Sequence, residues 1–218
     1  MNCLYGFLWL CTAVNSAKRC KIKLVFHLPP MPELIENIAF QQRPTWDEYF
    51  MLLTKLAAMR STCLAFPVGA VIVKDKQVLA TGYNGSPSGS VHCTTQGYCY
   101  PNVITCDASK EFPSRAVHAE ANAIAQAAKH GISTDGASIY VTLEPCISCL
   151  KLVVSAGIRE VYYETTFNKG NNAALCQSFV QEGLVTLKQI KISPSVIQRA
   201  NLFLNSPTSE LRLFSELV

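Results

Sequence analysis

The second half of the chain alternates between helix-like and strand-like segments, and this alternation restricts the folds that it can adopt. Helices are expected over 119–130, 147–156 and 173–182, and strands over 137–143, 158–164 and 184–190. Strands that alternate with helices lie parallel in one sheet and are joined by right-handed crossovers. This half of the chain therefore predicts a parallel sheet covered by helices.

The segment before it predicts one helix and a hairpin. Thr45 is a helix N-cap, and Glu48 three residues later closes a capping box that opens a helix reaching about Arg60. Two short apolar runs, 69–73 and 78–82, flank a polar tetrapeptide and predict a β-hairpin. With the later strands, this gives an α/β fold class: three α/β/α layers around a five-stranded mixed sheet.

The length of 218 residues suits one compact domain with appendages, which we place at 31–192. Residues 1–30 carry an apolar run that is too short for a bilayer span of about 20 residues, and no positive charge precedes it. We interpret 1–30 as a disordered N-terminal extension or an unused upstream start, with a membrane-directing segment as the alternative. Residues 193–218 predict a C-terminal helix and a polar tail.

Charge and cysteine usage narrow the class of protein. A formal net charge of +4 is too mild to indicate nucleic acid as the main ligand and fits an anionic small molecule equally well. The ten cysteines occur partly in close pairs beside histidine, which favours metal ligands in a reducing compartment over a disulfide framework. The cytoplasm is therefore the expected location, with no membrane partner.

Two short motifs open consecutive predicted helices. The first is His118-Ala119-Glu120, and the second is Pro145-Cys146-Ile147-Ser148-Cys149. Cysteines three apart at a helix start project to one side, so both thiolates reach one ion, and His118 supplies a third ligand from the neighbouring helix. Three nitrogen and sulfur ligands suit tetrahedral Zn²⁺ and leave a fourth position for water, as in catalytic zinc sites.

Glu120 lies two residues beyond the histidine ligand and is expected to remain unbound. From there its carboxyl can take a proton from an attacking water and pass protons onward. A C-x-x-C pair by itself equally indicates a structural zinc half-site or a redox pair, and His-x-Glu by itself indicates little. Both motifs together, each at a helix start, favour a catalytic site.

These residues resemble the cytidine/deoxycytidylate deaminase superfamily over about 44–187, and more narrowly the deoxycytidylate (dCMP) deaminases. The segments that carry the resemblance are Trp46-x-x-Tyr49, Arg60-Ser61-Thr62-Cys63, 68–73, Gly82-Tyr83-Asn84-Gly85-Ser86-Pro87 and 118–124. The resemblance implies a cytidine-deaminase-like fold and zinc-dependent hydrolysis of dCMP to dUMP and ammonia, in line with the zinc-deaminase signature. It also implies a small-molecule nucleotide substrate and a homo-oligomer.

Three polar residues are candidates for binding the substrate. Asn84 lies in a turn that can present backbone N–H groups and an amide to a sugar or phosphate, although it also suits a plain tight turn. Asn122 lies one turn into the helix expected over 119–130, and its side chain faces either the pocket or solvent. Arg60 is either a phosphate contact or a surface charge at a helix end.

The irregular stretch 83–117 suggests a second metal site. By resemblance to family members that hold a structural zinc in this region, the expected ligands are Cys63, Cys93, Cys99 and Cys106. Four thiolates would order a loop that is too polar to pack alone. The alternative is free thiols, and His92 is a further possible ligand.

Two other functions fit parts of the pattern. The tRNA-adenosine deaminases share Thr142-Leu143-Glu144-Pro145-Cys146, so that segment does not discriminate, whereas the Gly-Tyr-Asn-Gly-x-Pro loop favours the nucleotide enzymes. The second alternative is a competence-associated zinc protein without catalysis. Glu120 argues for catalysis, because a purely structural metal site has no use for a free carboxyl.

Overall fold

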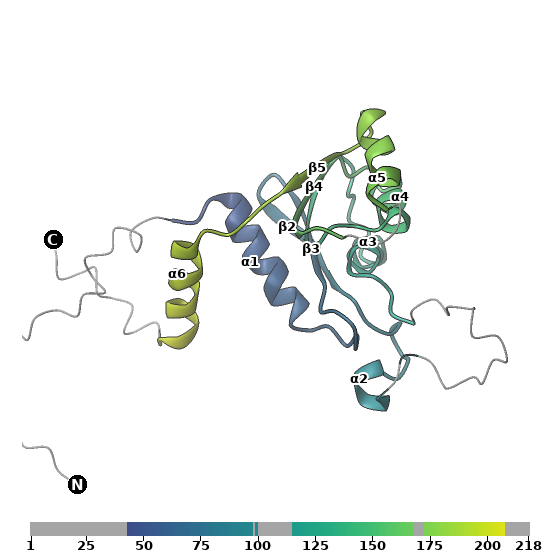
Figure 1. Cartoon of the computed structure of the whole chain (residues 1–218). Coiled ribbons are helices and arrows are strands. Elements are labelled where there is room, and N and C mark those ends of the chain that lie inside the picture. The colour runs from purple at the N-terminus through teal and green to yellow at the C-terminus, as the bar shows by residue number, and fades with distance from the viewer. Residues whose placement is uncertain (1–42, 98, 100–114, 168–171, 208–218) are drawn as a thin grey trace, which may run out of the picture. The chain divides into compact units, whose positions relative to one another are not determined.

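The computed structural model describes residues 43–97, 99, 115–167 and 172–207 (Figure 1). The helices are α1 (Trp46–Ala58), α2 (Cys93–Gln96), α3 (Ala119–Lys129), α4 (Ile147–Ser155), α5 (Asn172–Gln181) and α6 (Pro194–Asn205). The strands are β1 (Gly69–Lys74), β2 (Gln77–Tyr83), β3 (Ser138–Leu143), β4 (Glu160–Thr165) and β5 (Thr186–Gln189). The extension over 1–30 lies outside the described residues.

The strands form one five-stranded sheet in the order β2-β1-β3-β4-β5. β1 is antiparallel to both β2 and β3, whereas β3, β4 and β5 run parallel. The predicted fold class, with its mixed sheet, hairpin and parallel half, is confirmed. The helix and strand ends lie within two residues of the predicted ones, and several coincide with them.

Alternating side chains on the sheet divide the core into two layers. Ala70 and Ile72 of β1 pack with α3, α4 and α5 on one face. Val71 and Val73 point the other way and pack with α1 and the start of α6. Figure 1 shows α1 and α6 on the opposite side of the sheet from α3, α4 and α5. Because successive residues of a strand point to opposite faces, one apolar strand serves both layers.

The starts of α1 and α6 are joined through one carboxylate. The predicted capping box is present: Glu48 accepts a hydrogen bond from the Thr45 amide at 2.9 Å, and its own amide donates to the Thr45 hydroxyl at 3.2 Å. The other oxygen of Glu48 accepts from the hydroxyl and amide of Ser193, at 2.7 and 3.1 Å. Burial acts to raise the pKa of Glu48, but these hydrogen bonds outweigh it and lower the pKa to about 2. These hydrogen bonds connect the C-terminal helix α6 to α1, which packs on the sheet.

The contact between β2 and α3 is unusually close because Gly82 has no side chain. A Cβ built there would lie 2.2 Å from the Ala119 carbonyl oxygen and 2.5 Å from the Ala123 amide nitrogen. Ala119 and Ala123 are themselves fully buried. Since α3 carries both His118 and Glu120 at its start, this contact determines where the candidate site lies.

No helix within the described ranges has the length and apolarity needed to cross a membrane.

Replacing this glycine tests the packing. We expect Gly82→Ala to lower the free energy of unfolding by about 1–3 kcal/mol, because the added methyl meets backbone atoms that cannot rotate away. Urea unfolding measures the change, and Thr81→Ala, at the exposed neighbouring position, is the matched control. Equal stability of Gly82→Ala and the wild-type chain would contradict the close contact.

Candidate active site

The three predicted metal ligands converge at the starts of two helices. His118 is the N-cap of α3, Cys146 is the N-cap of α4, and Cys149 lies in the first turn of α4. The Nδ1 atom of His118 lies 3.6 Å from the sulfur of Cys146 and 3.3 Å from that of Cys149. Within the described part of the chain, these three residues form the one group of at least three His, Cys, Asp or Glu side chains spaced to share an ion.

The backbone explains why the ligand side chains are available. At both N-cap positions the residue is extended, with φ and ψ of −69° and 155° at His118 and −71° and 161° at Cys146. Neither side chain makes a capping hydrogen bond to its own helix, so each is free to face the other. The segment before His118 is held by two backbone hydrogen bonds between Val117 and Gly85, at 3.2 and 2.8 Å.

The spacing of the donor atoms fits a tetrahedral zinc ion. Zinc–sulfur and zinc–nitrogen bonds of about 2.3 and 2.0 Å at a tetrahedral angle separate the two donors by about 3.5 Å. The distances from His118 Nδ1 to the two sulfurs bracket that value. A set of two sulfurs and one imidazole leaves the fourth position of the ion for another ligand.

The two thiols differ in their acidity. A hydrogen bond with Cys149, opposed by burial and supported by His118, lowers the pKa of Cys146 to about 4. The pKa of Cys149 is raised, first by its hydrogen bond with Cys146 and then by burial. The hydrogen bond with Cys146 raises the pKa of His118 against the effect of burial. The lower pKa favours the thiolate form at Cys146, and a divalent cation held here would favour loss of the Cys149 proton as well.

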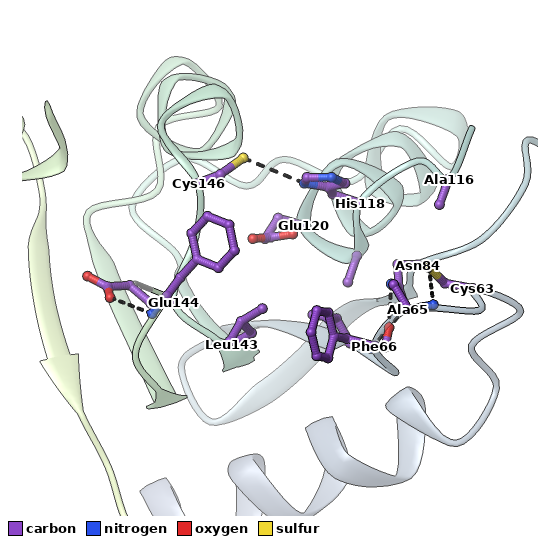
Figure 2. A pocket seen from close by; sticks show the side chains of 13 residues that line it. Cys63, Ala65, Phe66, Asn84, Ala116, His118, Glu120, Leu143, Glu144 and Cys146 are labelled. Atoms are coloured by element: carbon purple, nitrogen blue, oxygen red, sulfur yellow. Dashed lines mark hydrogen bonds between the residues drawn. The ribbon is translucent and has the colours of Figure 1, made fainter. Parts of the chain in front are cut away.

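Glu120 lies beside the ligands without joining them. Its side chain is almost fully buried, at 4 % exposure, and Figure 2 shows its carboxyl next to the His118 and Cys146 pair. Burial raises its pKa above the ordinary carboxyl value, against the opposing effects of its own backbone amide and of His118. A carboxyl in such surroundings holds a proton more readily than a solvated one and is suited to proton transfer.

A cavity of about 210 Å³ opens over these residues. Glu120, His118 and Cys146 line it together with a mainly apolar wall, formed by Ala65, Phe66, Val68, Ala116, Ala119, Leu143 and Phe167. Figure 2 shows Phe66 and Leu143 across the cavity from His118. A mainly apolar wall with a few polar groups is typical of a site for a small molecule.

Asn84 lines this cavity, and it also organises the cavity wall. Its side-chain oxygen accepts hydrogen bonds from the Val68 amide at 2.9 Å and from the Ser61 hydroxyl at 2.6 Å. Its side-chain nitrogen donates to the Phe66 carbonyl at 2.7 Å. From the sequence, Asn84 suits a substrate contact or a plain tight turn, and its role in holding the segment that carries Phe66 was not predicted.

The other two predicted substrate contacts lie outside the cavity. Arg60 is exposed just beyond α1 and is not among the cavity-lining residues. The side-chain nitrogen of Asn122 donates to the Tyr83 carbonyl at 2.7 Å, so this residue faces β2 and a separate hollow. The structure therefore places neither Asn122 nor Arg60 among the residues that line the cavity with Glu120. Their contact with a substrate stays a prediction.

The predicted second metal ligands are only partly described. Cys93 is buried, and its sulfur lies 3.5 Å from the Ser86 hydroxyl and 3.9 Å from the Cys99 carbonyl oxygen. Cys63 lines the cavity, where its sulfur accepts from the Ala65 amide at 3.5 Å. Cys106 lies outside the described residues. Cys93 and Cys99 are therefore neighbours, and the remainder of the predicted ligand set stays untested.

Glu144 was missed as a functional residue although it belongs to a recognised motif. Its carboxylate lines the cavity and accepts a hydrogen bond from the Phe167 amide at 3.0 Å. This bond joins the segment after β3 to the one after β4, and both carry cavity-lining residues. Its position directly before Pro145 and Cys146 was the signal that could have identified it.

An α/β/α fold with two cysteines and one histidine at two helix starts defines a protein with a zinc centre of the catalytic type. Comparison with known proteins specifies the family. Residues 44–165 match the family model described as "Cytidine and deoxycytidylate deaminase zinc-binding region". The chain therefore belongs to the cytidine and deoxycytidylate deaminase family.

Relatives in this family include proteins of bacteria and phages. ComE operon protein 2 of Bacillus subtilis is 41% identical over 160 residues, which cover 73% of this chain and 79% of that protein. The deoxycytidylate deaminase of Mycobacterium phage D29 is 43% identical over 125 residues, covering 56% of this chain and 95% of the phage protein. The structure of the cyanophage S-TIM5 dCMP deaminase, in complex with dCMP and dUMP, has a TM-score of 0.55 at 28% identity, covering 68% of this chain and 99% of that one.

Two substitutions within the site distinguish a metal ligand from the unbound carboxyl. We expect Cys146→Ala to lose the zinc held at this site, because one of only three protein ligands is removed. We expect Glu120→Ala to retain that zinc, because Glu120 is not among the clustered donor atoms. Metal analysis of both purified variants checks this, and loss of the zinc from Glu120→Ala would make the carboxyl a ligand instead.

Proposed function

We propose that this chain is a zinc-dependent hydrolase that converts dCMP to dUMP and ammonia in pyrimidine deoxynucleotide metabolism. The observation that carries the proposal is the buried carboxyl of Glu120, which sits unligated beside the His118, Cys146 and Cys149 cluster on the wall of a small apolar cavity. Relatives named deoxycytidylate deaminase support the choice of substrate.

Metal binding and proton transfer fall to different residues of the chain. His118, Cys146 and Cys149 would hold the zinc ion, which would supply an acidified water as the nucleophile for C4 of the cytosine ring. Glu120 takes a proton from the attacking water and delivers protons to the ring nitrogen and then to the departing amine, which leaves as ammonia.

The cavity wall positions the base for this chemistry. Phe66, Val68 and Leu143 offer apolar surface to the faces of the pyrimidine ring and exclude water from it. Phe66 is 58 % exposed, so it lies at the mouth of the cavity rather than in the core. Asn84 reaches the same cavity from the turn after β2 and is the candidate contact for the sugar.

A comparison of substrates tests the assignment. We expect the purified chain to release ammonia from dCMP faster than from cytidine, deoxycytidine or dCTP, and not from a tRNA anticodon arm. Glu120→Ala is expected to lower kcat for dCMP by about 10²–10⁴-fold, because general acid–base transfer is lost. Ser178→Ala, in α5 and away from the cavity, is the matched control.

The two rival functions predict different results in this comparison. Activity on the tRNA arm without activity on dCMP would assign the chain to adenosine deamination. A fully zinc-loaded chain that releases no ammonia from any of these substrates would favour the zinc protein without catalysis. ComE operon protein 2, whose name specifies no reaction, gives the second alternative its support.

We propose a second, structural zinc held by Cys63, Cys93, Cys99 and Cys106. The proximity of Cys93 to the Cys99 carbonyl supports it. Roughly two equivalents of zinc are expected in the wild-type chain, and roughly one each in Cys93→Ala and Cys146→Ala, because each variant breaks one tetrahedral site. Metal analysis that finds only one equivalent in the wild-type chain would reject this second zinc and leave the cysteines as free thiols.

We also propose that the protein acts in the cytoplasm as a homo-oligomer. Cys63, Cys93, Cys146, Cys149 and Cys176 are free thiols, which supports a reducing compartment. Large apolar side chains are exposed on α1, namely Trp46, Tyr49 and Leu56, with Met59 just beyond its end. A surface of this kind is typical of a face that packs against another subunit.

A further inference from the structure

Asn172 is the first residue of α5, and its side chain forms hydrogen bonds to the backbone on both sides of the metal ligand Cys146. Its side-chain oxygen accepts a hydrogen bond from the Ile147 amide at 2.8 Å. Its side-chain nitrogen donates to the Pro145 carbonyl at 3.3 Å. Pro145 and Ile147 are the residues on either side of Cys146, so one amide side chain contacts both peptide groups that flank the ligand.

The first of these bonds satisfies an amide at the start of α4. The first amides of a helix have no partner within the helix, and the N-cap side chain normally satisfies one of them. Cys146 occupies the N-cap position of α4 but makes no capping hydrogen bond, and its sulfur faces His118 instead. Asn172 provides an acceptor for the first helical amide from outside the helix, which is one of the amides that the helix itself leaves unpaired.

The burial of Asn172 shows that its contacts are specific. The residue is only 7 % exposed, and a buried amide is unfavourable unless its polar atoms are paired. Both ends of its side chain find partners in the three-residue segment around Cys146. The thiol of Cys176, one turn further along α5, lies 3.7 Å from the same Pro145 carbonyl and adds a weaker contact.

We propose that Asn172 is a positioning residue for the zinc centre: it holds the backbone at Cys146 so that the sulfur is aimed at His118 Nδ1. The inference rests on the zinc site of the proposed function but not on the identity of the substrate. Outer residues that orient metal ligands typically contribute about 10–100-fold to metal affinity. Asn172 acts here on the backbone of the ligand rather than on its donor atom.

Zinc affinity measures this role directly. In competition with a chromophoric chelator, Asn172→Ala is expected to bind the zinc held through Cys146 about 10–100-fold more weakly than the wild-type chain. The zinc retained by Cys146→Ala under the same conditions is the baseline, so that metal held elsewhere is subtracted. Ser178→Ala, which removes a hydrogen bond from another part of α5, is expected to bind zinc as the wild-type chain does.

A second variant and a stability measurement separate positioning from general folding. Asn172→Asp keeps an oxygen for the Ile147 amide but loses the donor to Pro145, and is expected to fall between wild type and Asn172→Ala in zinc affinity. The rise in Tm on adding zinc to the metal-stripped protein should be smaller in both variants, because stabilisation by a bound ligand grows with the logarithm of its affinity. A purely structural role would lower Tm equally with and without zinc.

The outcomes are distinct from those of the substrate comparison, since no catalytic turnover is measured. Zinc affinity of Asn172→Ala and Asn172→Asp within about threefold of wild type would overturn the inference, whatever the chain deaminates. Should Asn172→Ala fail to fold, Asn172→Asp decides the question by the same threshold. Weakened zinc binding would support the inference even if dCMP were not the substrate.

Discussion

The convergence of two helix starts at one edge of the sheet is the constraint on which the site depends. α3 precedes β3 and α4 follows it, so the starts of both helices meet beyond the end of that strand. This arrangement brings an imidazole and two sulfurs within bonding reach of one ion. The positive potential at helix N-termini adds to the stability of the thiolates there. The absence of a side chain at Gly82 lets α3 sit close enough to β2 to complete the arrangement.

The ligand residues His118 and Cys146 do not cap their own helices, and other parts of the chain hold the segments around them. Val117 pairs with Gly85 ahead of His118, and Asn172 bonds the peptides around Cys146. Glu144 links two cavity-lining segments in a comparable way. The metal centre is thus supported by hydrogen bonds to backbone groups from three separate parts of the chain. Such support reduces the freedom of the ligands before any ion binds, which favours binding.

Sequence reasoning succeeded where the signal was local or periodic. The capping box at Thr45 and Glu48, the hairpin, and the alternating half of the chain all followed from short-range rules, and the structure has each of them. The metal motif was recognisable because His-x-Glu and Cys-x-x-Cys each sit at a helix start. The orientation of Asn122 toward Tyr83 was not predictable, because helical spacing leaves more than one direction open for a residue one turn from His118.

The sequence by itself determined the order of elements, the kind of metal ligand and the presence of a free carboxyl beside them, because these depend on residue type and spacing along the chain. Only the tertiary structure decided how deeply Glu120 is buried, and hence the upward shift of its pKa. It also decided that Asn84 and Asn172 hold backbone segments distant in sequence. Burial and long-range hydrogen bonds arise from packing between elements, and no local pattern of residues records which elements will meet.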